Sequence, residues 1–371
     1  MIRVDYSKIL GYAFPVWKFI SFSIVALRHI KLLRQLNYYV RFYDCDKIYS
    51  YNPSKKVKIL FIHPAFYALF RYIAFIDKTI NKLRQWSDVL IGVDVADSDR
   101  ISEKAVEIAN LHDYFIVNSQ WSKEAFISSG VKTNIYVIPH FLTNEWINAI
   151  KNIESYVKTD PFWSSLLELK KQKNYIFVYY QLLHSGWRKG ADLVYEVLKE
   201  VQEMYSNVIL ILKRSHILDP YLGKLRELKH FEIPSTQNIY DLVASYYVSD
   251  IVLLFSRGGS FEMIGLEALS VGRILLCPEK GAWTEYVPNE VRKYSFVKIA
   301  REVIPMPNNP IHIGKGYEID VNNAVEKLCF IIEHLNELKE LYNSVKHKVI
   351  NKYNEDNARK LFSELLERIK S

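Results

Sequence analysis

Short apolar runs rich in β-branched and aromatic residues alternate along the chain with longer stretches of helical periodicity. In the first half, the predicted strands cover residues 39–43, 57–63, 89–93, 114–117 and 135–138. Helical spacing of apolar residues covers 14–35, 66–84, 101–111 and 122–129, the last with Ser122 as N-cap and Gly130 at its end. This alternation is typical of a doubly wound α/β domain, in which helices cover both faces of a parallel sheet.

A second alternation of the same kind begins after residue 173. It comprises predicted strands at 176–180, 208–213, 251–255 and 274–277, and predicted helices at 191–205 and 262–270. Residues 143–173 are polar and lack a clear period, so we expect them to form an irregular junction between two domains, 1–150 and 174–350. Residues 354–371 form a final amphipathic helix, whose apolar face must pack against another part of the chain.

Length and composition agree with this organisation. A chain of 371 residues, 49% of them hydrophobic, is long enough to bury two cores. Its three cysteines, Cys45, Cys277 and Cys329, are too scattered for a disulfide framework or a zinc site, which favours a cytoplasmic protein. The apolar stretch 13–27 contains Lys18, falls short of the roughly 20 residues that span a bilayer, and has no signal-peptide cleavage site after it.

The net charge of +8 suits an anionic partner, such as a nucleotide diphosphate or the inner face of a membrane. The sequence contains no zinc finger, RNP aromatic signature or helix-turn-helix pattern, so we expect no specific nucleic-acid binding. Aromatic and basic side chains near the start, including Trp17, Lys18 and Arg28, fit two explanations. They could contact a membrane peripherally or pack into a core, and the sequence leaves both open.

Two loops of the second domain have the chemistry of a phosphate site. The predicted strand 251–255 leads into a glycine-rich turn and a helix start. Backbone N–H groups there, at Gly258, Gly259, Ser260 and Phe261, could hold a phosphate. Arg188 and Lys189 follow strand 176–180 and could clamp a pyrophosphate. Ordinary solvated loop charges explain this cation pair equally well when it is considered alone.

These pieces, in this order, resemble the family 4 retaining glycosyltransferases of the GT-B fold over most of the chain. KGAD at 189–192 is similar to the family's Lys-Gly-x-Asp, and SRGGSFEMIGLEALSVG at 256–272 is similar to its Ser-x-x-Glu-x-Phe-Gly-x-x-x-x-Glu-Ala. CPEKGAWTEYV at 277–287 is similar to its Gly-Gly-x-x-Glu segment. In the first domain, residues 111–131 followed by VIPH at 137–140 resemble its Asp-x-x-hydrophobic-x-x-Ser helix and Pro-Asn-Gly turn.

The resemblance implies two Rossmann-like doubly wound domains facing across a crevice, with helix 354–371 crossing back to the first domain. The first domain would bind the acceptor, a glycan, lipid or small molecule, and the second a UDP- or GDP-linked sugar. Transfer would retain the anomeric configuration and need no metal or other cofactor. Glu267 would hold the ribose hydroxyls, and the full donor-binding set that the resemblance implies is His184, Gly186, Gly259, Ser260, Phe261, Met263 and Glu267.

Departures from the family pattern concentrate where the sugar would react. The first glutamate of the family's pair falls at Gly259, which has no carboxylate, and Glu262 stands three residues later. Glu262 either replaces the missing carboxylate or only complements the positive end of the following helix. His184 stands where the family has arginine, and Asp94 stands where it has a sugar-contacting histidine. The catalytic candidates are therefore Arg188, Lys189, Glu262 and Asp94.

Further polar residues follow strands of the first domain. His63, Asp97 and His140 are acceptor-side candidates, although Asp97 or Ser98 also suits the N-cap of the helix predicted from residue 101. Asp97 and Asp99 spell a metal-binding Asp-x-Asp, yet the family needs no metal, so we expect no metal site. A catalytically silent nucleotide-sugar-binding or scaffold protein with the same fold is the main rival, supported by Gly259. Another enzyme of this fold, an epimerase or phosphorylase, is the second.

Overall fold

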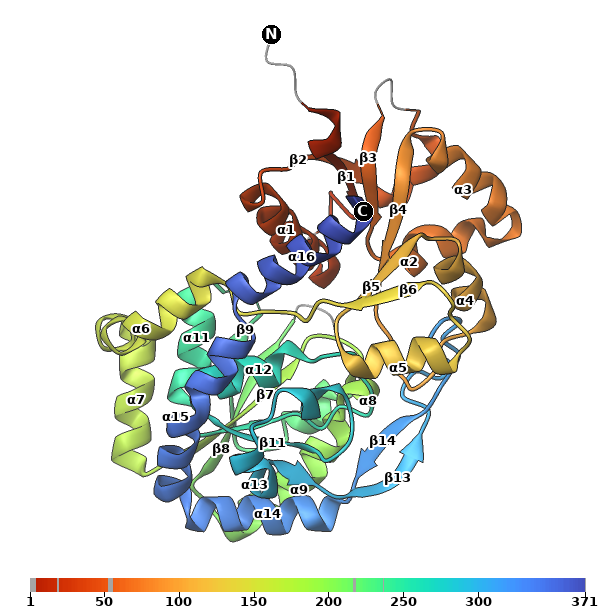
Figure 1. Ribbon diagram of the computed structural model, residues 1–371. Helices are drawn as coiled ribbons and strands as arrows, with labels where there is room; N and C mark the ends of the chain where they lie inside the picture. The colour runs from red at the N-terminus through yellow and green to blue at the C-terminus, as the bar shows by residue number, and fades with distance from the viewer. Residues whose placement is uncertain (1–4, 19, 53–55, 216–217, 236, 371) are drawn as a thin grey trace. The chain divides into compact units, whose positions relative to one another are not determined.

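The computed structural model describes residues 5–18, 20–52, 56–215, 218–235 and 237–370 (Figure 1). The chain separates into two units. Unit 1 comprises Met1–Phe141, Pro307–Gly314 and Glu355–Ser371, and unit 2 comprises Leu142–Met306 and Lys315–Asn354. Each unit contains a six-stranded sheet of parallel strands.

The sheet of unit 1 has the strand order β2-β1-β3-β4-β5-β6. One face packs on α1 and α16, where Phe362 and Leu365 are fully buried, and the other packs on α2 to α5. The final helix therefore belongs to the first domain, as the resemblance implied. The strands are β1 Ile9–Phe14, β2 Tyr39–Asp44, β3 Val57–Ile62, β4 Ser87–Val93, β5 Tyr114–Val117 and β6 Asn134–Val137, and the α-helices are α1 Ser21–Gln35, α2 Ala65–Leu69, α3 Ile76–Arg84, α4 Glu103–Asn110, α5 Gln120–Ser128 and α16 Glu355–Lys370.

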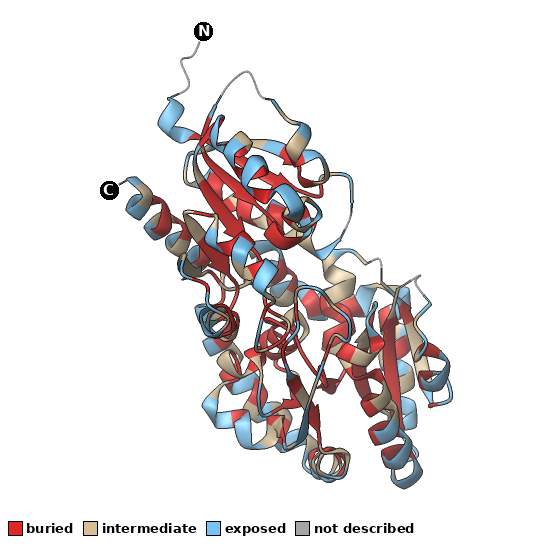
Figure 2. Ribbon diagram, turned by 90° about the vertical axis from the view of Figure 1, so that its right-hand side faces the viewer, coloured by how far each residue is buried: buried red, intermediate tan, exposed pale blue. Residues whose placement is uncertain are grey.

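The sheet of unit 2 has the order β12-β11-β10-β7-β8-β9, and an antiparallel hairpin, β13–β14, lies beside it. The inner strands of both sheets are largely buried, whereas most of the longer helices have a buried and an exposed side (Figure 2). The strands are β7 Ile176–Leu182, β8 Val208–Arg214, β9 His230–Pro234, β10 Ile251–Leu253, β11 Ile274–Pro278, β12 Phe296–Val297, β13 Ile299–Val303 and β14 Gly316–Ile319. The α-helices are α6 Asn144–Thr159, α7 Pro161–Lys173, α8 Gly186–Lys189, α9 Ala191–Met204, α10 Leu222–Leu225, α11 Ile239–Val248, α12 Met263–Ser270, α13 Arg292–Ser295, α14 Val321–Glu333 and α15 Leu335–Lys352.

The prediction that residues 143–173 are irregular was wrong. They form α6 and α7, which follow the N-cap residues Thr143 and Asp160. The side chain of each N-cap accepts hydrogen bonds from backbone N–H groups of its helix. Trp146 and Ile153 lie on the buried stripe of α6, but the polar residues around them obscured the helical period in the sequence.

Several boundaries in unit 1 also differ from prediction. The helix expected from residue 14 begins at Ser21, because Phe14 is the last residue of the buried strand β1 and a turn at Val16 and Trp17 follows it. Ser119, not Ser122, caps α5 by accepting from the Ser122 N–H at 3.0 Å. The helix expected at 66–84 is divided at Phe75, whose φ of −143° and ψ of 40° lie outside helical geometry.

Both sheets have a topological switch point, where the chain leaves a strand on one side and returns on the other. In unit 2 this point lies between β7 and β10, and in unit 1 between β1 and β3. Ligands of open parallel sheets bind beyond the carboxyl ends of the strands at such points. A nucleotide site is therefore expected at the loops after β7 and β10. Among the described residues, no helix has the length and apolar character to cross a bilayer.

Candidate functional site

The loops after β7 and β10 are in direct contact. The Arg257 N–H after β10 donates to the Arg188 carbonyl after β7 at 2.7 Å. Gly190 has φ +70°, and a Cβ there would lie 2.1 Å from the Phe255 carbonyl oxygen, so only glycine allows this approach. The short helix α8 is thereby fixed at the switch point.

Glu262 binds both cations of α8. The Arg188 guanidinium donates to its Oε1 at 3.2 Å, and Lys189 Nζ donates to the same oxygen at 2.6 Å and also contacts Oε2. The side chains of Arg188, Lys189 and Glu262 are only 10%, 16% and 6% exposed. They are therefore a buried ion cluster, and the solvated-charge explanation of Arg188 and Lys189 is wrong.

The backbone of Glu262 directs this arrangement. Glu262 lies at the N-cap of α12 in the left-handed region, with φ 59°, and its side chain makes no capping hydrogen bond. A Cβ added to Gly259 would lie 2.3 Å from Glu262 Oε1. The Glu262 carboxylate thus fills the space beside Gly259 and forms no hydrogen-bonded cap of α12. Its role in place of the missing family carboxylate stays a prediction.

A second buried arginine, which the sequence analysis missed, holds α8 in place. Arg257 is 1% exposed and binds Asp192 through two contacts of 2.7 Å. It also donates to Glu318 at 2.8 Å and to the Trp187 carbonyl at 2.7 Å, and its guanidinium stacks 3.5 Å from the centre of the Trp187 ring. Asp192, the last residue of the KGAD motif, was the available sequence signal for this network.

The other donor-side candidates take different positions. Glu267 on α12 is 8% exposed and accepts from the Tyr246 hydroxyl at 2.8 Å. Ser260 is buried beside the turn, whereas Phe261 is 1% exposed and packs against Tyr286 and Tyr353 in the core.

The three remaining donor-side candidates, His184, Gly186 and Met263, lie at or just before the first residues of α8 and α12. The Gly186 N–H donates to Asp219 at 2.8 Å, and the exposed His184 contacts the Ser185 hydroxyl at 2.8 Å. Met263, the first residue of α12, is half-buried.

In unit 1, Asp94 follows β4 and is buried. Its carboxylate accepts from the Phe66 N–H at 2.7 Å and from the Val95 N–H at 2.8 Å. Burial raises the pKa of Asp94 to about 7, because the charged form is poorly solvated there. Asp94 can therefore exchange a proton near neutral pH.

Asp97 and Ser98 contact the segment 307–314, which belongs to unit 1. The Asp97 N–H lies 3.3 Å from His312 Nδ1, and the Gly314 N–H donates to Ser98 Oγ at 3.2 Å. The helix that follows, α4, is capped by Ser102. The cap role considered for Asp97 or Ser98 is therefore wrong.

His63 and His140 both lie at the carboxyl edge of the unit 1 sheet. His63 Nδ1 is 3.3 Å from the Tyr12 hydroxyl, which is also 2.8 Å from His29 Nδ1. His140 Nε2 contacts the Asn118 amide at 3.1 Å. Burial lowers the pKa of His63 to about 3 and that of His140 to about 4, so both are neutral at pH 7. Sequence reasoning missed Tyr12, His29 and Asn118 because their spacing carries no motif.

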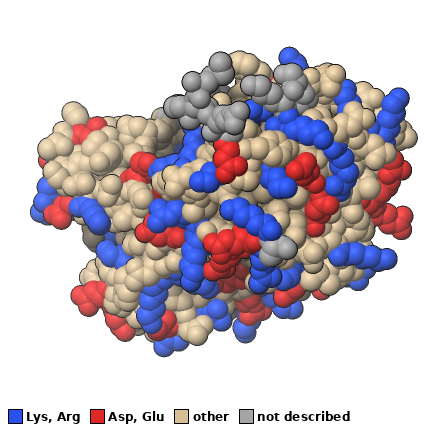
Figure 3. Space-filling view, turned by 45° about the horizontal axis from the view of Figure 1, so that its top comes forward, with Lys and Arg blue, Asp and Glu red and all other residues tan. Residues whose placement is uncertain are grey.

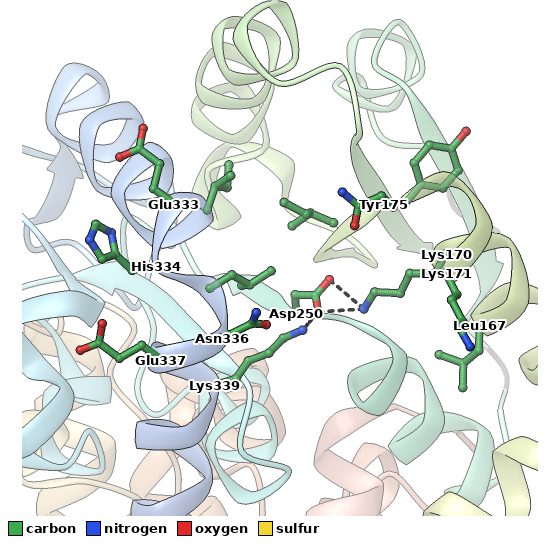
Figure 4. A pocket seen from close by; sticks show the side chains of 14 residues that line it. Leu167, Lys170, Lys171, Tyr175, Asp250, Glu333, His334, Asn336, Glu337 and Lys339 are labelled. Carbon is green, nitrogen blue, oxygen red and sulfur yellow. Dashed lines mark hydrogen bonds and ion pairs between the residues drawn. The ribbon is translucent and has the colours of Figure 1, made fainter.

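A pocket of about 810 Å³ lies at the opposite edge of the unit 2 sheet (Figure 4). Lys170 and Lys339 converge there on the buried Asp250, which also accepts the Phe177 N–H at 2.8 Å. These contacts join α7, α15 and β10 at the amino ends of the strands, away from the edge where such sheets bind nucleotides. We therefore assign them a structural role.

Charge elsewhere is mixed. Lysine and arginine are interspersed with aspartate and glutamate on the face in Figure 3. Within the described ranges, no group of three or more histidine, cysteine, aspartate or glutamate residues is placed to hold a metal ion. Metal independence stays a prediction.

Comparison with known structures defines the class of fold. A glycosyltransferase from Rickettsia africae aligns with a TM-score of 0.67 over 98% of each chain, at 13% identity. A UDP-forming α,α-trehalose-phosphate synthase from Burkholderia xenovorans aligns with a TM-score of 0.69 over 98% of this chain and 99% of that chain, at 8% identity. The two parallel sheets are those of the GT-B fold, as predicted.

Sequence relatives define the family. No family model matches the chain. "Putative glycosyltransferase 45" of a Sulfolobus islandicus filamentous virus is 30% identical over 279 residues, covering 74% of this chain and 72% of the relative. "Uncharacterized protein 356" of Sulfolobus islandicus rod-shaped virus 1 is 32% identical over 348 residues, covering 94% of this chain and 93% of the relative. The chain belongs to the glycosyltransferase family of these viral proteins.

Proposed function

We propose that this protein is a retaining, metal-independent glycosyltransferase that uses a UDP- or GDP-linked sugar. The observation that carries the proposal is the pair Arg188 and Lys189, held at the switch point of unit 2 and bound by a single carboxylate, Glu262. Two buried cations that share one carboxylate are suited to bind a second anion in its place. The UDP-forming synthase of the same fold supports a nucleotide diphosphate as that anion.

The cations would act on the leaving group. In transfer, the bond between the sugar C1 and the diphosphate oxygen breaks, and a bond between C1 and the acceptor oxygen forms. The acceptor proton passes to the leaving diphosphate oxygen on the same face of the sugar. Arg188 and Lys189 stabilise the negative charge that develops on that oxygen, and Arg257 keeps α8 in position for this role.

Glu262 would have a different partner once the donor is bound. The diphosphate replaces its carboxylate at Arg188 and Lys189, and the carboxylate becomes available to sugar hydroxyls beside Gly259. It would thus supply the carboxylate that Gly259 lacks. On α12, Glu267 would accept hydrogen bonds from the ribose.

Unit 1 would hold the acceptor. Asp94, His63 and His140 all follow strands at its carboxyl edge, and the two histidines are neutral hydrogen-bonding groups at pH 7. Asp94 supplies a carboxyl group near its titration point. These groups suit the binding of hydroxyl groups rather than of a strongly charged acceptor.

The test has two stages. The chain is first heated with UDP, GDP, ADP or CDP, and a ligand at about 100 times its Kd should add roughly 2.7 kcal/mol of stability. Sugars linked to the stabilising nucleotide are then offered with an acceptor library, and product is detected by mass spectrometry. A chain stabilised by none of these nucleotides would refute the proposal. Binding without transfer or hydrolysis of any donor would favour a nucleotide-sugar-binding protein.

A further inference from the structure

Lys213 is a buried cation that has no role in the proposed transfer mechanism. It lies near the carboxyl end of β8, opposite Gln181 of β7, and is only 5% exposed. Among the described residues, none accepts a hydrogen bond from its ammonium group or forms an ion pair with it. Buried lysines are rare, and burial without a partner is unfavourable. Such a group is expected where a ligand supplies the missing acceptor.

Lys213 shares one face of the sheet with a row of polar groups that leads to Glu267. Side chains alternate along strands, so Lys213 faces the same side as Gln181 and Tyr179. The Tyr179 hydroxyl donates to Gln181 at 3.3 Å, and its ring is 4.8 Å from that of Tyr246. Tyr246 in turn donates to Glu267 at 2.8 Å. The row therefore has an ammonium group at one end and a carboxylate at the other.

The two charges influence each other without touching. Burial lowers the pKa of Lys213, and the negative charge of Glu267 partly opposes that shift. In the part of the chain that the structure describes, Lys213 and Glu267 form no ion pair with each other. Glu267 also binds Tyr246.

A hydroxyl group both donates and accepts a hydrogen bond, so neighbouring hydroxyls match a carboxylate and an ammonium group together. We propose that Lys213 and Glu267 together bind the ribose hydroxyls of the donor nucleotide, Glu267 accepting from one and Lys213 donating to the oxygen of the other. This proposal rests on the proposed function, because it takes α12 as part of the nucleotide site. It makes Lys213 a residue that distinguishes ribonucleotides from deoxyribonucleotides.

The test is a calorimetric comparison of full-length wild type with Lys213→Met, which keeps most of the buried side-chain length and removes the charge. The probes are UDP and GDP, each with its 2′-deoxy and 3′-deoxy form, and inorganic pyrophosphate. Lys199→Met, which removes an exposed lysine of α9 in the same unit, is the matched control.

Of UDP and GDP, we consider the one that wild type binds more tightly. We expect its affinity to be at least 10-fold higher than that of its 2′-deoxy or its 3′-deoxy form. Lys213→Met should weaken ribonucleotide binding about 10-fold and reduce the ribose-to-deoxyribose preference to less than 3-fold. Pyrophosphate affinity should not change. The melting temperature of Lys213→Met should not fall, because the substitution removes a largely buried charge that no described residue accepts a hydrogen bond from.

Three results would overturn the inference. An unchanged ribose preference in Lys213→Met would remove Lys213 from the ribose site, and equal losses of pyrophosphate and UDP affinity would make it a phosphate contact. In both cases the proposed function stands, because nucleotide still binds wild type. If wild type binds neither UDP nor GDP, the proposed function itself fails, and the inference fails with it.

Discussion

Replacing Glu262 by glutamine removes the negative charge that Arg188 and Lys189 share. Glu262 Oε1 lies 3.2 Å from the Arg188 guanidinium and 2.6 Å from Lys189 Nζ. The side chains of all three residues are at most 16% exposed. Breaking a buried ion pair costs roughly 3–5 kcal/mol when nothing replaces the lost partner. Because glutamine keeps one oxygen acceptor for a charged donor, we expect the free energy of unfolding to fall by about 1–3 kcal/mol.

The same substitution should tighten nucleotide binding. In wild type, a diphosphate has to displace the Glu262 carboxylate, whereas in Glu262→Gln it meets cations that lack a full counter-charge. If this 1–3 kcal/mol of lost stability is recovered when nucleotide binds, the affinity for UDP or GDP rises roughly 5- to 150-fold. Transfer should nevertheless slow about 10²-fold, because the charged contact with the sugar is lost.

Calorimetry with UDP and GDP, thermal unfolding and a transfer assay measure the three effects together. Glu302→Gln is the matched control, because it removes a carboxylate from an exposed ion pair with Lys315 and should change stability by less than about 1 kcal/mol. Weaker nucleotide binding by Glu262→Gln than by wild type would refute the displacement of Glu262 by diphosphate. Unchanged turnover would refute its contact with the sugar.

The remaining predictions concern single groups. Lys189→Ala should lower turnover at least about 10²-fold in a nucleotide-release assay, and a rate within about twofold of wild type would remove Lys189 from the site. Glu267→Gln should raise KM more than it lowers kcat, because ribose is held alike in ground and transition states, and unaltered UDP and GDP affinities by calorimetry would contradict this role. The lowered pKa values of His63 and His140, about 3 and about 4, mean that the unfolded chain takes up protons first, so wild-type stability should fall as pH drops from about 6.5 towards 4. The raised pKa of Asp94, about 7, has the opposite sign: its stabilising contribution is complete below about pH 4 and is lost as pH rises from about 4 to about 7, so the melting temperature of Asp94→Asn should rise relative to that of wild type over this range.

Periodicity and loop chemistry predicted much of unit 2 because they are local properties. The strands containing Val178 and Leu210 are continuous apolar runs, as expected of parallel strands buried on both faces. The fold brings the cations after β7 to the glycine-rich turn after β10 because these strands are neighbours. The pairing of β7 with β10 follows from the Rossmann-like topology, which the alternation of strand and helix patterns in the sequence predicted.

Side-chain pairings across long sequence separations were not predictable in this way. Arg257 binds Asp192 and Glu318, which lie 65 and 61 residues away, and no local pattern links them. Glu262 reaches Arg188 and Lys189 because its backbone takes a left-handed conformation, which is uncommon for a residue other than glycine. The cluster of Tyr12, His29 and His63 likewise depends on helix α1 packing over two strands.

The most direct test of the central claim compares the affinities of UDP and GDP with those of uridine and guanosine in wild type and in Arg188→Met and Lys189→Met. Two charge-assisted hydrogen bonds of roughly 1.5–3 kcal/mol each correspond to a diphosphate preference of about 10² to 10⁴. The account predicts that one diphosphate binds wild type at least about 100-fold more tightly than its nucleoside, and that each substitution removes about 10-fold or more of this preference. Equal affinities for nucleoside and diphosphate, or a preference unchanged in both variants, would contradict the assignment of Arg188 and Lys189 as the diphosphate site.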